Sequence, residues 1–165
     1  MSVPQRLKSF LDSKYIPYQS LAHSTTYTAQ GTATLMHISG KEIAKTVVLC
    51  AGAEGEDTIL AVLPGSKHVK LDKLAAVIGK PVRLASEPEF SSLFPDCELG
   101  AMPPFGSCFG MPVIVDTRLA ARFIAFNPGT HRDVVRMSFA DSRRIAMPLI
   151  ATITAVAAAG RDVLV

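Results

Sequence analysis

The feature that most constrains the fold is an apolar strand pattern interrupted by one lysine. Residues 40–50 read Gly-Lys-Glu-Ile-Ala-Lys-Thr-Val-Val-Leu-Cys, and from Ile43 onward they predict a β-strand covered on both faces. Because side chains alternate along a strand, Lys45 shares a face with Val47 and Leu49. An ammonium among aliphatic side chains either reaches water or meets an anion. The pattern alone favours a strand-end lysine in solvent; the alternative is a lysine that holds a phosphate or carboxylate ligand.

The composition is that of a folded chain with one core. Of the 165 residues, 48% are hydrophobic and 19% are charged, which excludes a disordered chain. We therefore treat residues 1–165 as a single domain. The net charge of +3 permits an anionic partner without requiring one.

The cysteines predict reduced thiols rather than disulfides or metal ligands. Cys50, Cys97 and Cys108 are odd in number, and no secretory leader precedes the first predicted helix, so we expect a cytoplasmic protein. No cysteine has the CxxC or CxxH spacing of a zinc site, so no metal is expected. No histidine lies at a spacing diagnostic of a thiol nucleophile, and we interpret Cys97 and Cys108 as packing residues.

Residues 145–160 are almost free of charge and test whether the chain enters a membrane. The stretch is short for a bilayer span, contains Pro148, and is built more from alanine and threonine than from leucine and isoleucine. We interpret it as a buried or partner-facing tail and predict no membrane association.

Short strands mixed with short helices predict an α+β fold with a mixed, curved sheet. The strand over residues 58–63 is expected to lie antiparallel to the Lys45 strand. Ser86 and Glu89 open a short helix expected to bury Phe90, Leu93 and Phe94. Further strands are predicted over residues 18–23, 82–85, 113–115, 122–126 and 134–138, and further helices over residues 4–14, 28–37, 71–78 and 139–147.

A proline loop is the second informative stretch. Residues 100–106 read Gly-Ala-Met-Pro-Pro-Phe-Gly, with two prolines that fix the backbone and two glycines that allow close approach of a ligand. Such a loop presents N–H and C=O groups at fixed positions, as an oxyanion or amino group requires. An ordinary Pro/Gly turn is the equally weighted alternative.

The remaining polar features are ambiguous by themselves. His131 follows Asn-Pro-Gly-Thr between two strands, and a lone loop histidine is usually solvated. A basic rim for a phosphate backbone is one interpretation of the cations, and scattered solubilising charge is the slightly favoured other. The residues concerned are Lys41, Lys67, His68, Lys70, Arg118, Arg132 and Arg136.

Several stretches, in order, resemble the YbaK/ProX family of trans-editing aminoacyl-tRNA deacylases, which shares its domain with the editing insertion of bacterial prolyl-tRNA synthetases. Residues 40–49 resemble the family's lysine strand, and residues 100–106 resemble its GxxxP loop. Residues 108–116 resemble the strand that follows, and residues 127–131 the glycine-histidine turn. The motif-bearing part spans about residues 25–148.

The resemblance implies a partly barrel-like sheet with flanking helices, and hydrolysis of the ester between a wrong amino acid and the 3′-terminal adenosine of tRNA. The implied partners are a mischarged aminoacyl-tRNA, of the proline-accepting type, and a prolyl-tRNA synthetase. The implied amino acid is small: alanine, cysteine, serine or threonine. The family uses no cofactor, no metal and no covalent protein nucleophile. A monomer and a homodimer remain equally open.

By the same resemblance, Lys45, Gly100 and Pro104 form the catalytic set. Lys45 would hold the terminal adenosine or its phosphate, and Gly100 and Pro104, with the backbone between them, would hold the aminoacyl group. The loop amides would polarise the ester carbonyl for attack by water. The implied substrate-binding residues are Thr28, Met102, Pro103, Phe105, Gly106, Gly129 and His131, with Thr26, Leu35 and Met36 as further candidate walls.

Two other functions are consistent with these residues. One is a non-catalytic module of the same fold that binds tRNA or a synthetase. The other is a small-anion-binding protein in which Lys45 holds a carboxylate or phosphate metabolite. A basic surface beside the pocket would argue against the latter.

Overall fold

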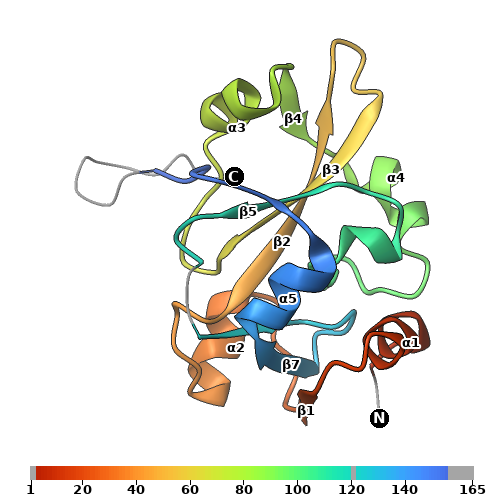
Figure 1. Cartoon of the computed structure of the whole chain (residues 1–165), viewed down its shortest axis with the longest axis vertical. Coiled ribbons are helices and arrows are strands. Elements are labelled where there is room, and N and C mark those ends of the chain that lie inside the picture. The colour runs from red at the N-terminus through yellow and green to blue at the C-terminus, as the bar shows by residue number, and fades with distance from the viewer. Residues whose placement is uncertain (1–2, 120–121, 156–165) are drawn as a thin grey trace.

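A long antiparallel hairpin forms the centre of the computed structural model, which describes residues 3–119 and 122–155 (Figure 1). Strand β2 (Ala44–Ala51) pairs along its whole length with β3 (Asp57–Pro64). This confirms the predicted antiparallel pair. We call the end that holds Ala44 and Pro64 the Lys45 end, and the end that holds the β2–β3 turn the hairpin end.

The hairpin lies within a mixed five-stranded sheet in the order β4-β2-β3-β5-β8. Strand β4 (Val82–Leu84) is antiparallel to β2, whereas β5 (Val113–Asp116) is parallel to β3 and β8 (Leu149–Ala151) is parallel to β5. The carboxyl ends of β3, β5 and β8 therefore meet the amino end of β2 at the Lys45 end of the sheet.

A second, antiparallel sheet has the order β1-β7-β6. It contains β1 (Tyr18–Ala22), β6 (Phe123–Phe126) and β7 (Asp133–Ser138). The two sheets meet at a parallel bridge between Ile43 and Ala125, and the Ala125 N–H donates to the Glu42 carbonyl over 2.9 Å. Residues 3–119 and 122–155 thus form an α+β fold, as predicted, with two joined sheets and no closed barrel.

Short helices flank both sheets. Helix α3 lies beside β4 toward the hairpin end, and α2 lies at the other end of the molecule (Figure 1). The helices are α1 (Gln5–Ser13), α2 (Ala29–Met36), α3 (Leu71–Ile78), α4 (Glu87–Phe90) and α5 (Phe139–Ala146), with 3₁₀ turns η1 (Ser91–Leu93) and η2 (Gly106–Cys108).

Both faces of β2 are covered, as its continuous apolar run predicted. Val48 packs into a core with Leu11 of α1 and Phe105 of the proline loop. On the opposite face, Leu49 packs with Leu74 of α3 and with other aliphatic side chains. Alternation along the strand places Lys45 on the Leu49 face.

Two sequence predictions needed correction or extension. Leu93 was expected to be buried but is 38% exposed, because the chain turns into η1 there, and Phe94 is the buried residue. Residues 149–155 pack on the body through β8 and the fully buried Ile153, while the rest of the predicted tail, 156–165, lies outside the described residues. Within residues 3–119 and 122–155, no helix has the length and apolar character needed to cross a bilayer.

Candidate functional site

Lys45 lies one residue inside the amino end of β2. Its register partner on β3 is Leu63, while Ala44 pairs with Pro64. The Lys45 side chain is half-buried. The lysine is therefore at the end of the sheet where three carboxyl strand ends converge.

The bridge between the sheets brings the histidine turn toward this end. Ile43 and Ala125 pair in parallel, so the chains that follow run in the same direction. Lys45 lies two residues beyond the bridge on one chain, and Asn127 lies two residues beyond it on the other. The turn that carries His131 begins at Asn127. The topology thus places two of the predicted stretches at one end of the molecule.

The start of α2 joins these two stretches. Ala29 packs against Gly65, where an added Cβ would come within 2.7 Å of the Ala29 Cβ atom. The Tyr27 ring packs on the His131 imidazole with centroids 4.9 Å apart, and the Thr26 N–H donates to the His131 carbonyl over 3.0 Å. Thr28 caps the helix by accepting the Gly31 N–H over 2.9 Å. Its hydroxyl oxygen therefore already accepts one structural bond, while its O–H group can still donate.

Three hydrogen bonds clamp the proline loop to the histidine turn. The Glu98 carboxylate accepts the His131 N–H over 2.6 Å, and the Glu98 N–H donates to the Gly129 carbonyl over 2.8 Å. The His131 Nε2 lies 2.6 Å from the Leu99 carbonyl oxygen. Because a carbonyl oxygen can only accept, Nε2 carries the proton, which leaves Nδ1 of the neutral ring as an acceptor.

Gly100 takes a conformation that favours glycine and lies against this histidine. Its φ is +84°, and a Cβ there would lie 3.5 Å from the His131 Cε1 atom. Within the described residues, the N–H groups of Gly100, Met102 and Phe105 meet no acceptor, and Pro103 and Pro104 have none to offer. These N–H groups are therefore backbone donors without a partner among the described residues.

The side chains of the loop are mostly packing groups. Phe105 is fully buried and Met102 is 6% exposed, and both belong to the main core. Pro103 and Pro104 are buried as well. Gly106 leaves no room for a side chain, because a Cβ would collide with the Met111 carbonyl. These side chains therefore hold the loop against the core.

The other predicted wall residues have varied surroundings. Gly129 has a φ of +130° and contacts Pro4 and Cys97. Thr26 is hydrogen-bonded to the buried Thr32 over 2.6 Å. Leu35 is 41% exposed, whereas Met36 packs against the small cluster around Ile43. Leu35 and Met36 both lie on α2, beyond the helix start that contacts the histidine turn.

Sequence reasoning missed Glu98 and Tyr27, the two residues that hold the histidine turn in place. Glu98 lies two residues before Gly100, and its charge next to a glycine-rich loop was the only signal available. Tyr27 is 77% exposed despite its ring contact with His131. An exposed aromatic side chain next to a clamped loop is a further contact surface for a ligand.

The cysteines are poorly suited to nucleophilic catalysis. Burial raises the pKa of Cys97 to about 12 and that of Cys108 to about 12, so both thiols are protonated at neutral pH. This agrees with their interpretation as packing residues. Within residues 3–119 and 122–155, no three His, Cys, Asp or Glu side chains come together as metal ligands.

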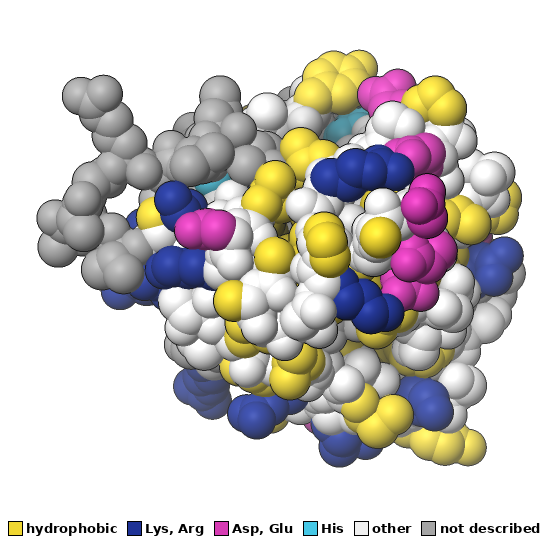
Figure 2. Space-filling view, turned by 90° about the horizontal axis from the view of Figure 1, so that it is seen from above, with side chains coloured by type: hydrophobic (Ala, Val, Ile, Leu, Met, Phe, Trp, Pro, Cys, Tyr) yellow, Lys and Arg dark blue, Asp and Glu magenta, His cyan; other side chains and the backbone are white. Residues whose placement is uncertain are grey.

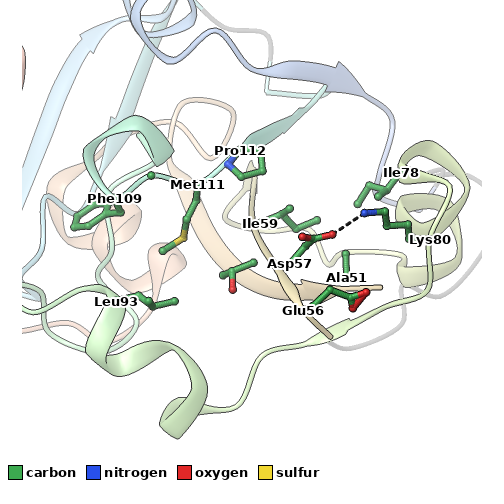
Figure 3. Close-up of a pocket in the computed structure, with 12 residues that line it drawn as sticks. Ala51, Glu56, Asp57, Ile59, Ile78, Lys80, Leu93, Phe109, Met111 and Pro112 are labelled. Atoms are coloured by element: carbon green, nitrogen blue, oxygen red, sulfur yellow. Dashed lines mark hydrogen bonds and ion pairs between the residues drawn. The ribbon is translucent and has the colours of Figure 1, made fainter. Parts of the chain in front are cut away.

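The cavity shown in Figure 3 does not coincide with these residues. It has a volume of about 570 Å³ and lies at the hairpin end, where two of its lining residues, Asp57 and Lys80, form an ion pair of 2.6 Å (Figure 3). Leu93, Phe109 and Met111 line its apolar side. None of its lining residues is one of the predicted catalytic or substrate-binding residues.

Comparisons with known proteins agree on one family. The profile of the aminoacyl-tRNA editing domain matches residues 23–145. The chain is 30% identical over 148 residues to the Multifunctional Ser/Thr-tRNA deacylase ProXp-y of Escherichia coli strain K12, covering 87% of this chain and 88% of the relative. The same protein of strain O157:H7 gives the same values.

Solved structures support the same fold. The hypothetical protein APE2540 superposes with a TM-score of 0.81 at 21% identity, covering 92% of this chain and 100% of that chain. A proposed trans-editing enzyme for prolyl tRNA synthetase superposes with a TM-score of 0.78 at 22% identity, covering 92% of this chain and 96% of that chain. At such identities the likeness establishes the fold alone.

Proposed function

The chain belongs to the aminoacyl-tRNA editing domain family, and from this premise we propose that it removes small hydroxyl-bearing amino acids, serine and threonine first, from mischarged tRNA. As a member of this family it is an aminoacyl-tRNA deacylase, a hydrolase that acts in trans. The choice of serine and threonine follows the substrates in the name of the 30% identical relative.

One observation carries the assignment to this site. The clamped Gly100 loop and the Lys45 end of the sheet both meet the start of α2. The loop holds His131, whose ring contacts Tyr27, and the sheet contacts α2 where Gly65 packs against Ala29. A fixed set of backbone donors therefore lies at the same end of the molecule as a half-buried cation. That is the arrangement needed to hold an ester at one point and an anionic RNA end at another.

The proposed chemistry needs only positioning and electrostatics, because an aminoacyl ester is already activated. In this proposal the N–H groups of Gly100, Met102 and Phe105, which meet no acceptor among the described residues, stabilise the oxyanion that forms when water adds to the ester carbonyl. Collapse of this intermediate breaks the bond to the ribose 3′-oxygen and yields the free amino acid and tRNA. The ribose 2′-hydroxyl is the group placed to orient the water.

Lys45 and His131 take positioning roles in this scheme. Lys45 holds the terminal adenosine or its phosphate, which fixes the ester relative to the loop. The Nε2–H of His131 is used to hold Leu99, so the ring acts on the substrate through Nδ1, which can accept a hydrogen bond from the α-ammonium of the amino acid. Neither residue needs to act as a base or a nucleophile.

A deacylation panel tests the proposal. Wild-type protein is incubated with tRNAs mischarged with serine, threonine, alanine or cysteine, and release of the amino acid is followed over the spontaneous rate. Release of serine and threonine, faster than release of alanine and cysteine, is expected. Release of none of the four would overturn the proposal and favour a non-catalytic tRNA-binding module.

The proline-accepting tRNA is the expected substrate by family resemblance, and the same panel addresses it. Serine is loaded on a proline tRNA and on a serine tRNA, and the ratio of kcat/KM values is measured. We expect the proline tRNA to be preferred. Repeating the assay with added prolyl-tRNA synthetase asks whether this enzyme is a partner, in which case kcat/KM rises with its concentration.

A further inference from the structure

A cationic pocket lies beside Lys45 and is not used by the proposed chemistry. It has a volume of about 540 Å³ and is formed by the turn before β2, the turn after β3 and the turn after β5. Its lining residues are Ser39, Gly40, Lys41, Pro64, Ser66, Lys67 and Arg118. Three cations and two hydroxyls thus converge on one space from three separate parts of the chain.

The three cations keep their charge uncompensated. Within residues 3–119 and 122–155, Lys41, Lys67 and Arg118 have no carboxylate within ion-pair distance, although other cations of the molecule are paired. The nearby Glu42 is engaged by Arg136 over 3.3 Å. Like charges that share a pocket repel one another, so the arrangement gains most from an anion placed between them.

Arg118 is held in place with donors to spare. The Asp116 carboxylate, itself buried, accepts the Arg118 backbone N–H over 2.7 Å and the Ile153 N–H over 2.8 Å. The Arg118 Nη1 donates to the Thr154 hydroxyl over 2.8 Å. Nη1 also donates to the Thr154 carbonyl over 3.4 Å, whereas the N–H groups of Nε and Nη2 meet no acceptor in the described part of the chain. A planar guanidinium suits a phosphate oxygen pair.

The pocket reaches β3, the strand that pairs with the Lys45 strand β2. Pro64, in its wall, pairs with Ala44, the residue that precedes Lys45, and the Gly65 N–H donates to the Ile43 carbonyl over 2.9 Å. Neighbouring strands lie about 4.8 Å apart. A strand of RNA whose last nucleotide is held at Lys45 therefore has its preceding phosphates within reach of this pocket.

We propose that this pocket binds backbone phosphates of the tRNA acceptor strand upstream of the terminal adenosine. The inference rests on the proposed function for the identity of the RNA, and it adds a phosphate site on Lys41, Lys67 and Arg118. An adjoining cavity of about 410 Å³, which shares Gly40 and Ser66, supplies an apolar flank for the attached riboses.

The test uses one RNA probe, two substrates and matched lysine variants. The variants are Lys67→Gln and the double Lys41→Gln/Lys67→Gln. The control is Lys14→Gln, which removes an exposed lysine at the end of α1 that has no ion pair among the described residues. Binding is measured with uncharged proline tRNA, and hydrolysis with seryl-tRNA and with 3′-O-seryl-adenosine, which has no phosphate.

The two pocket variants should weaken tRNA binding by about threefold and about tenfold, and should lower kcat/KM on seryl-tRNA by the same factors. Each lost contact should also make the slope of log K against log salt shallower by about 0.7 to 1. Hydrolysis of 3′-O-seryl-adenosine and the melting temperature should not change, and Lys14→Gln should leave every value as in wild type.

Two results would overturn the site. One is that the pocket variants bind tRNA as tightly as the Lys14 variant does. The other is that kcat/KM falls equally on seryl-tRNA and on 3′-O-seryl-adenosine, which would mean that the lysines have a structural role. The proposed function fails separately. A wild-type protein that cleaves no ester but binds uncharged tRNA through Lys41 and Lys67 keeps the phosphate site and loses the enzyme. If both variants cleave seryl-tRNA as fast as wild type, the proposed enzyme activity stands and the phosphate site is wrong.

Discussion

The two ends of the β2–β3 hairpin differ in what surrounds their charges. At the hairpin end, Lys80 pairs with Asp57 over 2.6 Å and Arg83 pairs with Glu89 over 2.7 Å. Seen from above, acidic side chains gather along one side of this face (Figure 2). At the Lys45 end, Lys41 and Lys67 meet no carboxylate within the described part of the chain.

This difference in charge pairing, rather than the volume of the cavities, distinguishes the two ends in function. The hairpin end contains the cavity of about 570 Å³, yet Lys80, a cation that lines it, is already paired with Asp57. Exposed pairs of this kind contribute little and offer nothing to an anionic ligand. The cavity of about 540 Å³ at the Lys45 end is lined instead by Lys41, Lys67 and Arg118, which have no carboxylate partner among the described residues. Such cations suit the phosphates of an RNA end.

Substitution of Lys45 should produce the largest effect that separates the two ends. Lys45→Ala removes the group proposed to fix the terminal nucleotide, so kcat/KM for deacylation should fall by about 100-fold. The fold should survive, since Lys45 is half-buried and its neighbours on β2 and β3 are aliphatic. Single-turnover deacylation and a thermal melt measure the two consequences.

The control for this variant lies at the hairpin end. Lys80→Ala removes a cation that lines the cavity of the hairpin end and is paired with Asp57. It should leave deacylation unchanged. Full activity in the Lys45 variant, or an equal loss in both variants, would remove the functional distinction between the ends.

Much of the fold was predictable because local patterns carried it. The branched run of β2, the Pro64-Gly65 break after β3 and the capping residues Ser86 and Glu89 each determine structure within a few residues. Strand β8 was missed because its apolar residues follow Pro148 in an alanine-rich stretch, and only parallel pairing with β5 makes them a strand. Pairing partners so distant leave no local signal.

The site was predictable only as far as motifs reached. The resemblance indicated Lys45, Gly100 and His131, and in the structure the start of α2 contacts His131 through Tyr27 and Gly65 through Ala29. Their assigned roles remain predictions. The bond between Glu98 and His131 joins residues that are 33 positions apart in the sequence. The cationic pocket is lined by Lys41 and Arg118, which lie near the ends of different strands. Spacing along the chain does not encode either arrangement.

Alanine at Gly100 should give an intermediate effect, and the chain offers a matched control. Gly100 has a φ of +84° beside His131, whereas Gly79 has a φ of +79° at the end of α3, with no atom within 4 Å of an added Cβ. Each Gly→Ala change should destabilise the fold by about 1 kcal/mol, because both positions are left-handed. Only Gly100→Ala should also reduce deacylation, by about tenfold, since it shifts the loop donors.

Urea unfolding and kcat/KM on seryl-tRNA separate these two consequences. Similar stability losses with unequal activity losses would place the catalytic requirement at the Lys45 end. If Gly100→Ala were as active as Gly79→Ala, the loop backbone would have no part in catalysis.

The smallest effect concerns the compensated charges of the hairpin end. The Arg83 guanidinium, together with the Ser86 N–H, lowers the pKa of Glu89 to about 2. A carboxyl whose folded pKa is lowered stabilises the fold above its ordinary pKa and loses that contribution as the pH falls toward 2.

The stability difference between wild type and Glu89→Gln should therefore be small at pH 7, because Glu89 is exposed, and should shrink further as the pH falls from about 4.5 to 2. Glu87→Gln, on the same helix and without an ion pair among the described residues, should show no such pH dependence in urea unfolding. Neither variant should alter deacylation at pH 7, because both residues lie at the hairpin end, away from the proposed substrate site at the Lys45 end.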